Sequence, residues 1–121
     1  MDSEREEGIS TAEALAQSGL ERLHNGDSTS AAESFAAAIA ADPGHVEAHH
    51  GLVRALGDAG RFEDAVAAAQ ALTLLTPDDP LAFAGLSIAL QRAGQIPEAE
   101  SAAGRARILE WKHQLAVGPV K

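Results

Sequence analysis

The sequence predicts an all-α fold, in which three successive helix pairs form a solenoid and the last helix is extended. Glycine recurs at an interval of 34 residues, at Gly26, Gly60 and Gly94. The same interval relates three alanines and two prolines, namely Ala31, Ala65, Ala99, Pro43 and Pro77. A repeat of about 34 residues is typical of stacked helix–turn–helix units. Alanine dominates the apolar content and aromatic residues make up only 3% of the chain, which fits closely spaced helices better than a β-rich fold.

The chain is predicted to become ordered at Ser10. Residues 1–9 are acidic and contain few apolar side chains, so we predict that they are disordered. Ser10 and Glu13 have the spacing of a capping box, which opens the first helix. This helix is predicted to end near Asn25–Gly26, because glycine accepts the left-handed backbone conformation that follows many helices.

The next three helices are predicted from the same signals. The second helix covers about residues 30–41, where Ser30 and Glu33 form another capping box. Apolar residues at helical spacing predict a third helix over about 47–59 and a fourth over about 62–75.

The last helix pair has clear start signals. Asp79 is the expected N-cap of a fifth helix over about 81–93, with Pro80 in its first turn. Pro97 opens a sixth helix that continues to about Ala116. Its predicted inward face consists of Ala99, Ala102, Ala103, Ala106, Leu109 and His113. The predicted organisation is a repeat domain over 10–116, with units 12–45, 46–79 and 80–113, followed by a tail over 117–121.

Charge and composition limit the classes of partner. The formal net charge is −9, and so acidic a chain is a poor partner for the phosphates of nucleic acid. Residues 1–79 contain fifteen acidic and four basic residues, whereas residues 80–121 contain three and five. This asymmetry would suit head-to-tail association, and it also fits ordinary solvated helix faces.

No compartment signal stands out in the sequence. The absence of cysteine excludes disulfides, zinc–thiolate sites and thiol catalysis. The first residues lack the apolar run of a secretory signal peptide, and no stretch approaches the ~18 apolar residues of a membrane span. We therefore expect a cytoplasmic protein without direct membrane insertion.

The repeated residues resemble the tetratricopeptide repeat (TPR). The resemblance covers three units in phase, from residue 12 to about residue 110. The matching residues are Leu15, Gly19, Gly26, Ala31, Phe35, Ala38 and Pro43 in the first unit, Leu52, Leu56, Gly60, Ala65, Leu72 and Pro77 in the second, and Phe83, Leu86, Leu90, Gly94, Ala99 and Ala106 in the third. The chain departs from the family where Ala69 and Ala103 replace bulky aromatic residues and where Trp111 replaces the closing proline.

The resemblance implies a right-handed superhelix whose concave face is lined by the first helix of each pair. On that face, apolar side chains would receive a partner helix while Arg54, Arg92 and His50 attract its acidic flank. The groove residues expected to bind a peptide or an amphipathic helix are Leu20, His50, Arg54, Leu81, Ala84, Ile88 and Arg92. The alternative is that the apolar members of this set simply pack between helices.

One well-known use of a TPR groove is excluded by the residues present. A carboxylate clamp for the C-terminal acid of a chaperone tail needs Lys, Asn, Asn, Lys and Arg at five positions. The residues at those positions are Ala16, Leu20, Gly51, Leu81 and Gly85. We therefore expect no clamp.

Catalytic, cofactor and metal sites are not expected. No acid–base pair has a predicted pocket around it, and no phosphate-binding glycine loop is present. His45 and His49 have a spacing that could hold a metal, but His45 falls in a turn and His49 occupies a packing position. We interpret both as structural residues and expect no enzyme activity.

The C-terminal helix is the second candidate binding surface. Ile108, Trp111 and Leu115 extend the apolar content past the last repeat, and no polar-faced capping helix follows them. These three residues could mediate self-association, or Trp111 could fold back over its own repeat. The sequence thus favours a non-catalytic protein–protein interaction module, an adaptor or chaperone-like scaffold that binds a protein or peptide partner. The alternative is a homo-oligomeric structural building block.

Overall fold

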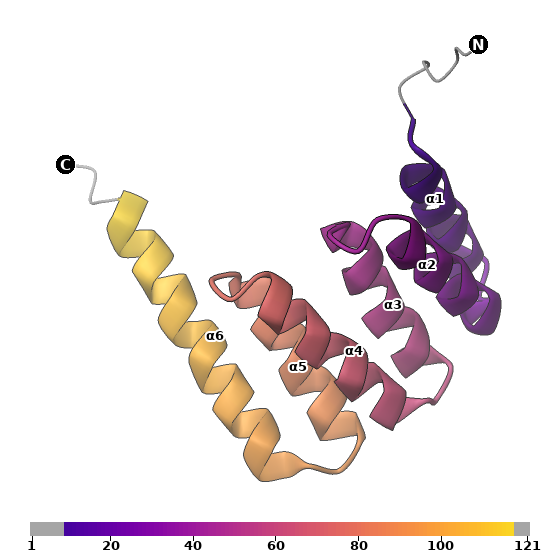
Figure 1. The fold of residues 1–121 in the computed structure, drawn as a ribbon. Helices are drawn as coiled ribbons and strands as arrows, with labels where there is room; N and C mark the ends of the chain where they lie inside the picture. Colours follow the sequence, from indigo (N-terminus) through magenta and orange to yellow (C-terminus); the bar gives the residue numbers. More distant parts are fainter. Residues whose placement is uncertain (1–8, 118–121) are drawn as a thin grey trace.

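The computed structural model describes residues 9–117, and within this range the chain folds into six α-helices (Figure 1). The helices are α1 (Thr11–His24), α2 (Ser28–Ala41), α3 (Val46–Asp58), α4 (Phe62–Leu75), α5 (Pro80–Arg92) and α6 (Ile96–Val117). The predicted number, order and pairing of the helices are therefore confirmed. Residues 1–8 and 118–121, which belong to the predicted disordered segment and tail, lie outside the described residues.

The helices form two layers. Each helix contacts the next one along the chain, and α3 also contacts both α1 and α5. Among the described residues, α2, α4 and α6 make no comparable contacts with one another. The layer of α1, α3 and α5 is therefore the closer-packed one and forms the concave side of the array (Figure 1).

Two of the predicted helix starts are confirmed by their hydrogen bonds. The backbone N–H of Glu13 donates to Ser10 Oγ at 3.0 Å, and the backbone N–H of Leu81 donates to Asp79 Oδ1 at 2.9 Å. Each bond satisfies one of the amide groups that a helix leaves unpaired at its N-terminus. Pro80, which lacks an N–H, lies in the first turn of α5 as predicted.

Three other starts differ from the prediction, and one of them is that of α6, which begins at Ile96, one residue before Pro97. The capping box at Ser30 and Glu33 is wrong, because α2 already begins at Ser28 and Asp27 Oδ1 accepts from the N–H of Ser30 at 3.2 Å. A carboxylate is also favoured at the positive end of the helix dipole. Similarly, α3 begins one residue before Glu47, because His45 Nδ1 accepts from the N–H of Ala48 at 3.1 Å.

The periodic glycines end the first helix of each pair. Gly26, Gly60 and Gly94 have φ angles of 84°, 79° and 84°. Gly26 donates its N–H to the carbonyl of Leu23, and Asp27 donates to the carbonyl of Arg22. The same two bonds recur after α3 and α5. This arrangement is a Schellman motif, so the 34-residue interval follows from a backbone conformation that strains any other residue.

The core is built mainly from small side chains, with one aromatic ring between the first two pairs. Phe35 on α2 is only 3% exposed and faces a glycine on each neighbouring helix. A Cβ added to Gly19 on α1 would lie 3.0 Å from the ring, and one added to Gly51 on α3 would overlap it. The alanines with 0% exposure are Ala31, Ala38, Ala48, Ala55, Ala69 and Ala82.

The second half of α6 extends beyond the other helices of the array (Figure 1). Ala99, Ala102, Ala106 and Leu109 are buried as predicted, and Ala103 is half-buried. His113, however, is exposed, which corrects the predicted inward face. The reason is length, because α6 has 22 residues and α5, its packing partner, has 13. Within residues 9–117, none of the helices combines the length and the apolar character that a membrane span requires.

The ring of Phe35 makes a matched pair of glycine substitutions informative. We expect Gly51→Ala to lower the free energy of unfolding by about 1–3 kcal/mol, because the new methyl group overlaps a confined ring. Gly85 lies one period later, and a Cβ added there would meet no heavy atom within 4 Å. Gly85→Ala should therefore be neutral or stabilising, by up to about 1 kcal/mol, because alanine has the higher helix propensity. Urea denaturation of both variants measures the difference, and equal midpoints would contradict this packing.

Candidate functional site

The concave side of the array contains two cavities, separated by α3. The first cavity, of about 640 Å³, lies between α1 and α3 and has Phe35 among its lining residues. The second cavity, of about 320 Å³, lies between α3 and α5 above residues of α4. His50 and Arg54 line both cavities, so these two side chains form the ridge between them. We call the two cavities together the concave groove.

The structure brings five of the seven predicted groove residues together. Leu20 lines the first cavity, Ile88 and Arg92 line the second, and the two α3 residues line both. Leu81 and Ala84 line neither cavity.

The apolar groove residues are open to solvent. Leu20, Ile88 and Leu81 are 48%, 57% and 69% exposed. The alternative interpretation, in which these side chains pack between helices, is therefore wrong for these three, whereas Ala84, the fourth apolar member of the set, is half-buried.

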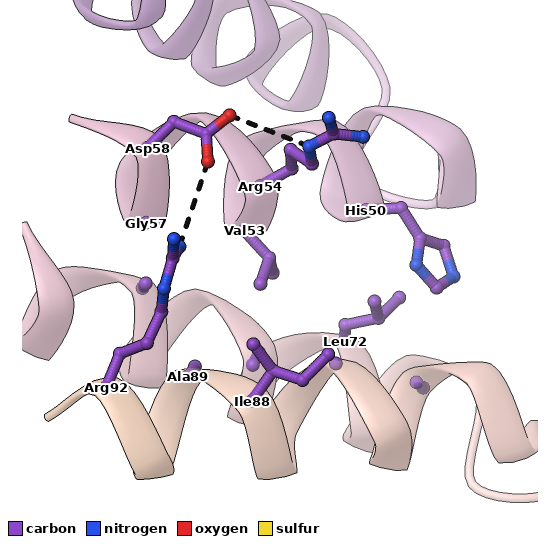
Figure 2. A pocket seen from close by; sticks show the side chains of 13 residues that line it. His50, Val53, Arg54, Gly57, Asp58, Leu72, Ile88, Ala89 and Arg92 are labelled. Atoms are coloured by element: carbon purple, nitrogen blue, oxygen red, sulfur yellow. Dashed lines mark ion pairs between the residues drawn. The ribbon is translucent and has the colours of Figure 1, made fainter. Parts of the chain in front are cut away.

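The second cavity lies where the repeat has an alanine in place of an aromatic ring. Ala69 on α4 occupies the repeat position that Phe35 occupies on α2, and Gly85 corresponds to Gly51. In the first pair the ring fills the space above the glycine, whereas the space next to Gly85 is empty. Val53, Leu72 and Ile88 surround this space (Figure 2). The result is an apolar hollow that opens onto the concave side.

Charged side chains lie at both ends of the second cavity. At one end, Asp58 Oδ2 is 3.6 Å from Arg54 Nε and Asp58 Oδ1 is 3.7 Å from an Arg92 guanidinium nitrogen (Figure 2). One carboxylate thus faces two guanidinium groups, which leaves this end with an excess of positive charge. At the other end, His50 Nε2 is 3.7 Å from a carboxylate oxygen of Asp79.

Arg92 is also held by an aromatic ring. Its guanidinium lies 5.8 Å from the ring centroid of Phe62, within the range of a cation–π contact. Arg54 has no such neighbour among the described contacts and is 71% exposed. The two arginines therefore differ in packing, and Arg54 is the more exposed of the two.

Both histidines considered for metal binding make structural contacts. His45 caps α3, and His49 Nε2 lies 2.8 Å from the carbonyl oxygen of Pro43 in the preceding turn. Within residues 9–117 no three His, Cys, Asp or Glu side chains are grouped closely enough to hold a metal ion.

The predicted self-association residues lie apart from the groove. Ile108, Trp111 and Leu115 are 48%, 61% and 59% exposed on the second half of α6, and none of them lines either cavity. Trp111 does not fold back over its own repeat, so that alternative is wrong.

Sequence reasoning missed two features of the site. The role of Asp58 as the shared partner of two arginines depends on a contact between α3 and α5 that no local pattern predicts. The second cavity did have a signal in the sequence, because Ala69 stands at the repeat position where the first unit has the aromatic residue Phe35. The sequence could not show that the space would stay empty.

The fold and the repeat pattern match known proteins. A tetratricopeptide repeat family model matches residues 22–87. No match was found among curated protein sequences. Three solved structures illustrate the likeness in fold.

The Yersinia enterocolitica type III secretion translocator chaperone SycD is 21% identical, with a TM-score of 0.77 over 86% of this chain and 79% of that chain. A MamA structure is 21% identical, with a TM-score of 0.79 over 85% of this chain and 60% of that chain, so the present chain spans less than two thirds of MamA. The second TPR of Spaghetti (RPAP3), bound to the HSP90 peptide SRMEEVD, is 21% identical, with a TM-score of 0.77 over 88% of this chain and 99% of that chain.

At these identities the solved structures establish the fold. The family model covers more than half of the chain, and its range includes the glycine turns after α1 and α3. The chain therefore belongs to the tetratricopeptide repeat family.

Proposed function

We propose that this protein is a non-catalytic protein–protein interaction module, an adaptor or chaperone-like scaffold whose concave groove binds a peptide or helix of another protein. The observation on which the proposal rests is the pair of apolar cavities on the concave side, with Leu20 and Ile88 exposed at them. Exposed apolar side chains around a preformed hollow favour binding of another apolar surface.

The solved relatives support a protein ligand. One of them is a translocator chaperone, and another was solved with a bound HSP90 peptide. The ligand of the present chain should differ from that peptide, because the five clamp positions hold alanine, leucine or glycine. Small and apolar residues at these positions favour apolar anchors over a terminal carboxylate.

The expected affinity is moderate. Burial of one leucine-sized anchor is worth roughly 1.5–3 kcal/mol, and the groove has two cavities to receive such anchors. Association and side-chain ordering oppose this gain.

A groove variant tests the proposal. Peptides selected from a displayed random library against the wild-type protein should lose affinity for Ile88→Glu by about tenfold or more, because a charge replaces an apolar wall of the second cavity. Leu74→Glu is the matched control, since Leu74 is 83% exposed and lines neither cavity. Fluorescence polarisation measures both variants, with SRMEEVD as a peptide expected not to bind. Failure to select any peptide, or equal loss in both variants, would refute the proposal.

A second candidate function is self-assembly through α6. The observation that favours it is the apolar stripe of Ile108, Trp111 and Leu115, which are each about half exposed or more and follow one another at helical spacing. Two copies that pack these stripes together would form an isologous interface.

Solution mass tests the self-assembly candidate. The average mass of the wild-type protein should rise with concentration, whereas Trp111→Glu should remain at the monomer mass, because the new charge replaces a 61% exposed indole at the centre of the stripe. Sedimentation equilibrium over a dilution series measures this, and Leu74→Glu again serves as the control. If wild type and Trp111→Glu have the same mass at every concentration, α6 is not an interface.

A further inference from the structure

We propose that the second cavity is a specificity pocket for one bulky apolar side chain of the partner peptide, and that it selects a side chain with a carboxylate close by. This inference rests on the proposed function and adds the chemistry of the ligand.

In the first helix pair a ring of the chain itself lies against the corresponding glycine, and the first cavity stays open beside it. Phe35 lies between Gly19 and Gly51, and a methyl group on Gly51 would overlap it. In the second pair the ring is absent at Ala69, and a Cβ added to Gly85 would meet no heavy atom within 4 Å. A partner side chain in the second cavity would therefore take the place that an intramolecular phenylalanine takes one period earlier.

The size and lining of the second cavity fit such a guest. Its volume is about 320 Å³, and an apolar cavity of about 150 Å³ already binds benzene. Ala69 and Leu72 lie beneath the cavity and are 0% and 1% exposed, so its accessible surface comes from Val53, Gly85 and Ile88. Val53 occupies the repeat position of Gly19, so the space is narrower on the α3 side than in the first pair.

The charges at the rim favour an acidic neighbour of the guest. Arg54 and Arg92 share the single carboxylate of Asp58, at 3.6 and 3.7 Å. These distances are longer than a charge-assisted hydrogen bond, so a ligand carboxylate can contact either guanidinium without breaking a tight pair. The opposite end, where His50 faces Asp79, has no such cationic excess, so the acid should lie at the Arg54–Arg92 end.

The same charges disfavour Trp111 of a second copy as the guest. Arg107 precedes Trp111 by one helical turn on the same face and Lys112 follows it directly, so these two cations outnumber the one acid beside it, Glu110. Docking this part of α6 would bring further cations to a rim that already has two guanidiniums for one carboxylate. The occupant is therefore a peptide of another protein.

Small-molecule probes test the pocket independently of any peptide. Indole-3-acetate and indole-3-acetamide have nearly the same shape and differ in charge. In a titration followed by ¹⁵N NMR, both should shift the amide signals of Ala69, Gly85 and Ala89, and the acetate should bind about two- to fivefold more tightly. Arg54→Gln should remove this difference. Shifts spread evenly over the protein, or equal affinities of the two probes for wild type, would overturn the proposal.

A substitution that fills the pocket is the decisive test of this proposal. Ala69→Phe restores the residue type found at position 35 and should reduce binding of both probes and of selected peptides by at least about tenfold. Ala103→Phe is the matched control, because Ala103 holds the same repeat position in the third unit, lines neither cavity, and should leave affinity unchanged. Circular dichroism verifies folding, and the smaller Ala69→Leu is used if the phenylalanine does not fit beside Val53.

The two proposals fail in different ways. If peptides bind in the groove but tolerate Ala69→Phe and Ala69→Leu, or lack a bulky residue with a nearby acid, the specificity pocket is refuted and the interaction module stands. If the probes bind as expected but no peptide depends on Ile88, the pocket is supported as an apolar site and the proposed function is refuted.

Discussion

The ring of Phe35 occupies the space between α1 and α3, and both helices approach it through a glycine. This contact determines how closely the first two pairs can stack, because the remaining core residues between them are mostly alanine. A small-residue core has little capacity to absorb a change in volume. The second pair follows the same backbone plan without the ring, and the space next to Gly85 is left unfilled. The same repeat position therefore contributes a buried ring to the first pair and a small side chain beneath the second cavity.

The concave groove combines this unfilled space with charges contributed by separate helices. Asp58 from α3 faces Arg54 of its own helix and Arg92 of α5, while Phe62 of α4 lies under Arg92. These contacts connect the second and third pairs on the concave side. They also place cations beside an apolar hollow, which is a suitable arrangement for a peptide that presents both an apolar and an acidic group.

Much of the fold could be predicted because its signals are local. The left-handed conformation at Gly26, the cap at Ser10 and the proline at position 80 each act within a few residues. Errors arose where two local signals competed or where a partner was missing. Asp27 and Ser30 both suit an N-cap, and the residue nearer the turn took that role. The pattern of α6 predicted an inward His113, but no helix extends far enough to cover it within the described part of the chain.

The sequence by itself determined the repeat, the glycine turn that ends the first helix of each pair, and the family, because these depend on backbone conformation and on spacing along the chain. It also determined which residues belong to the first helix of each pair. Only the tertiary structure decided that Leu81 and Ala84 lie outside the two cavities, that Asp58 is shared between two arginines, and that the space next to Gly85 stays open. The physical reason is that each of these facts depends on side chains from different helices meeting in space, at distances that the packing of the whole array sets.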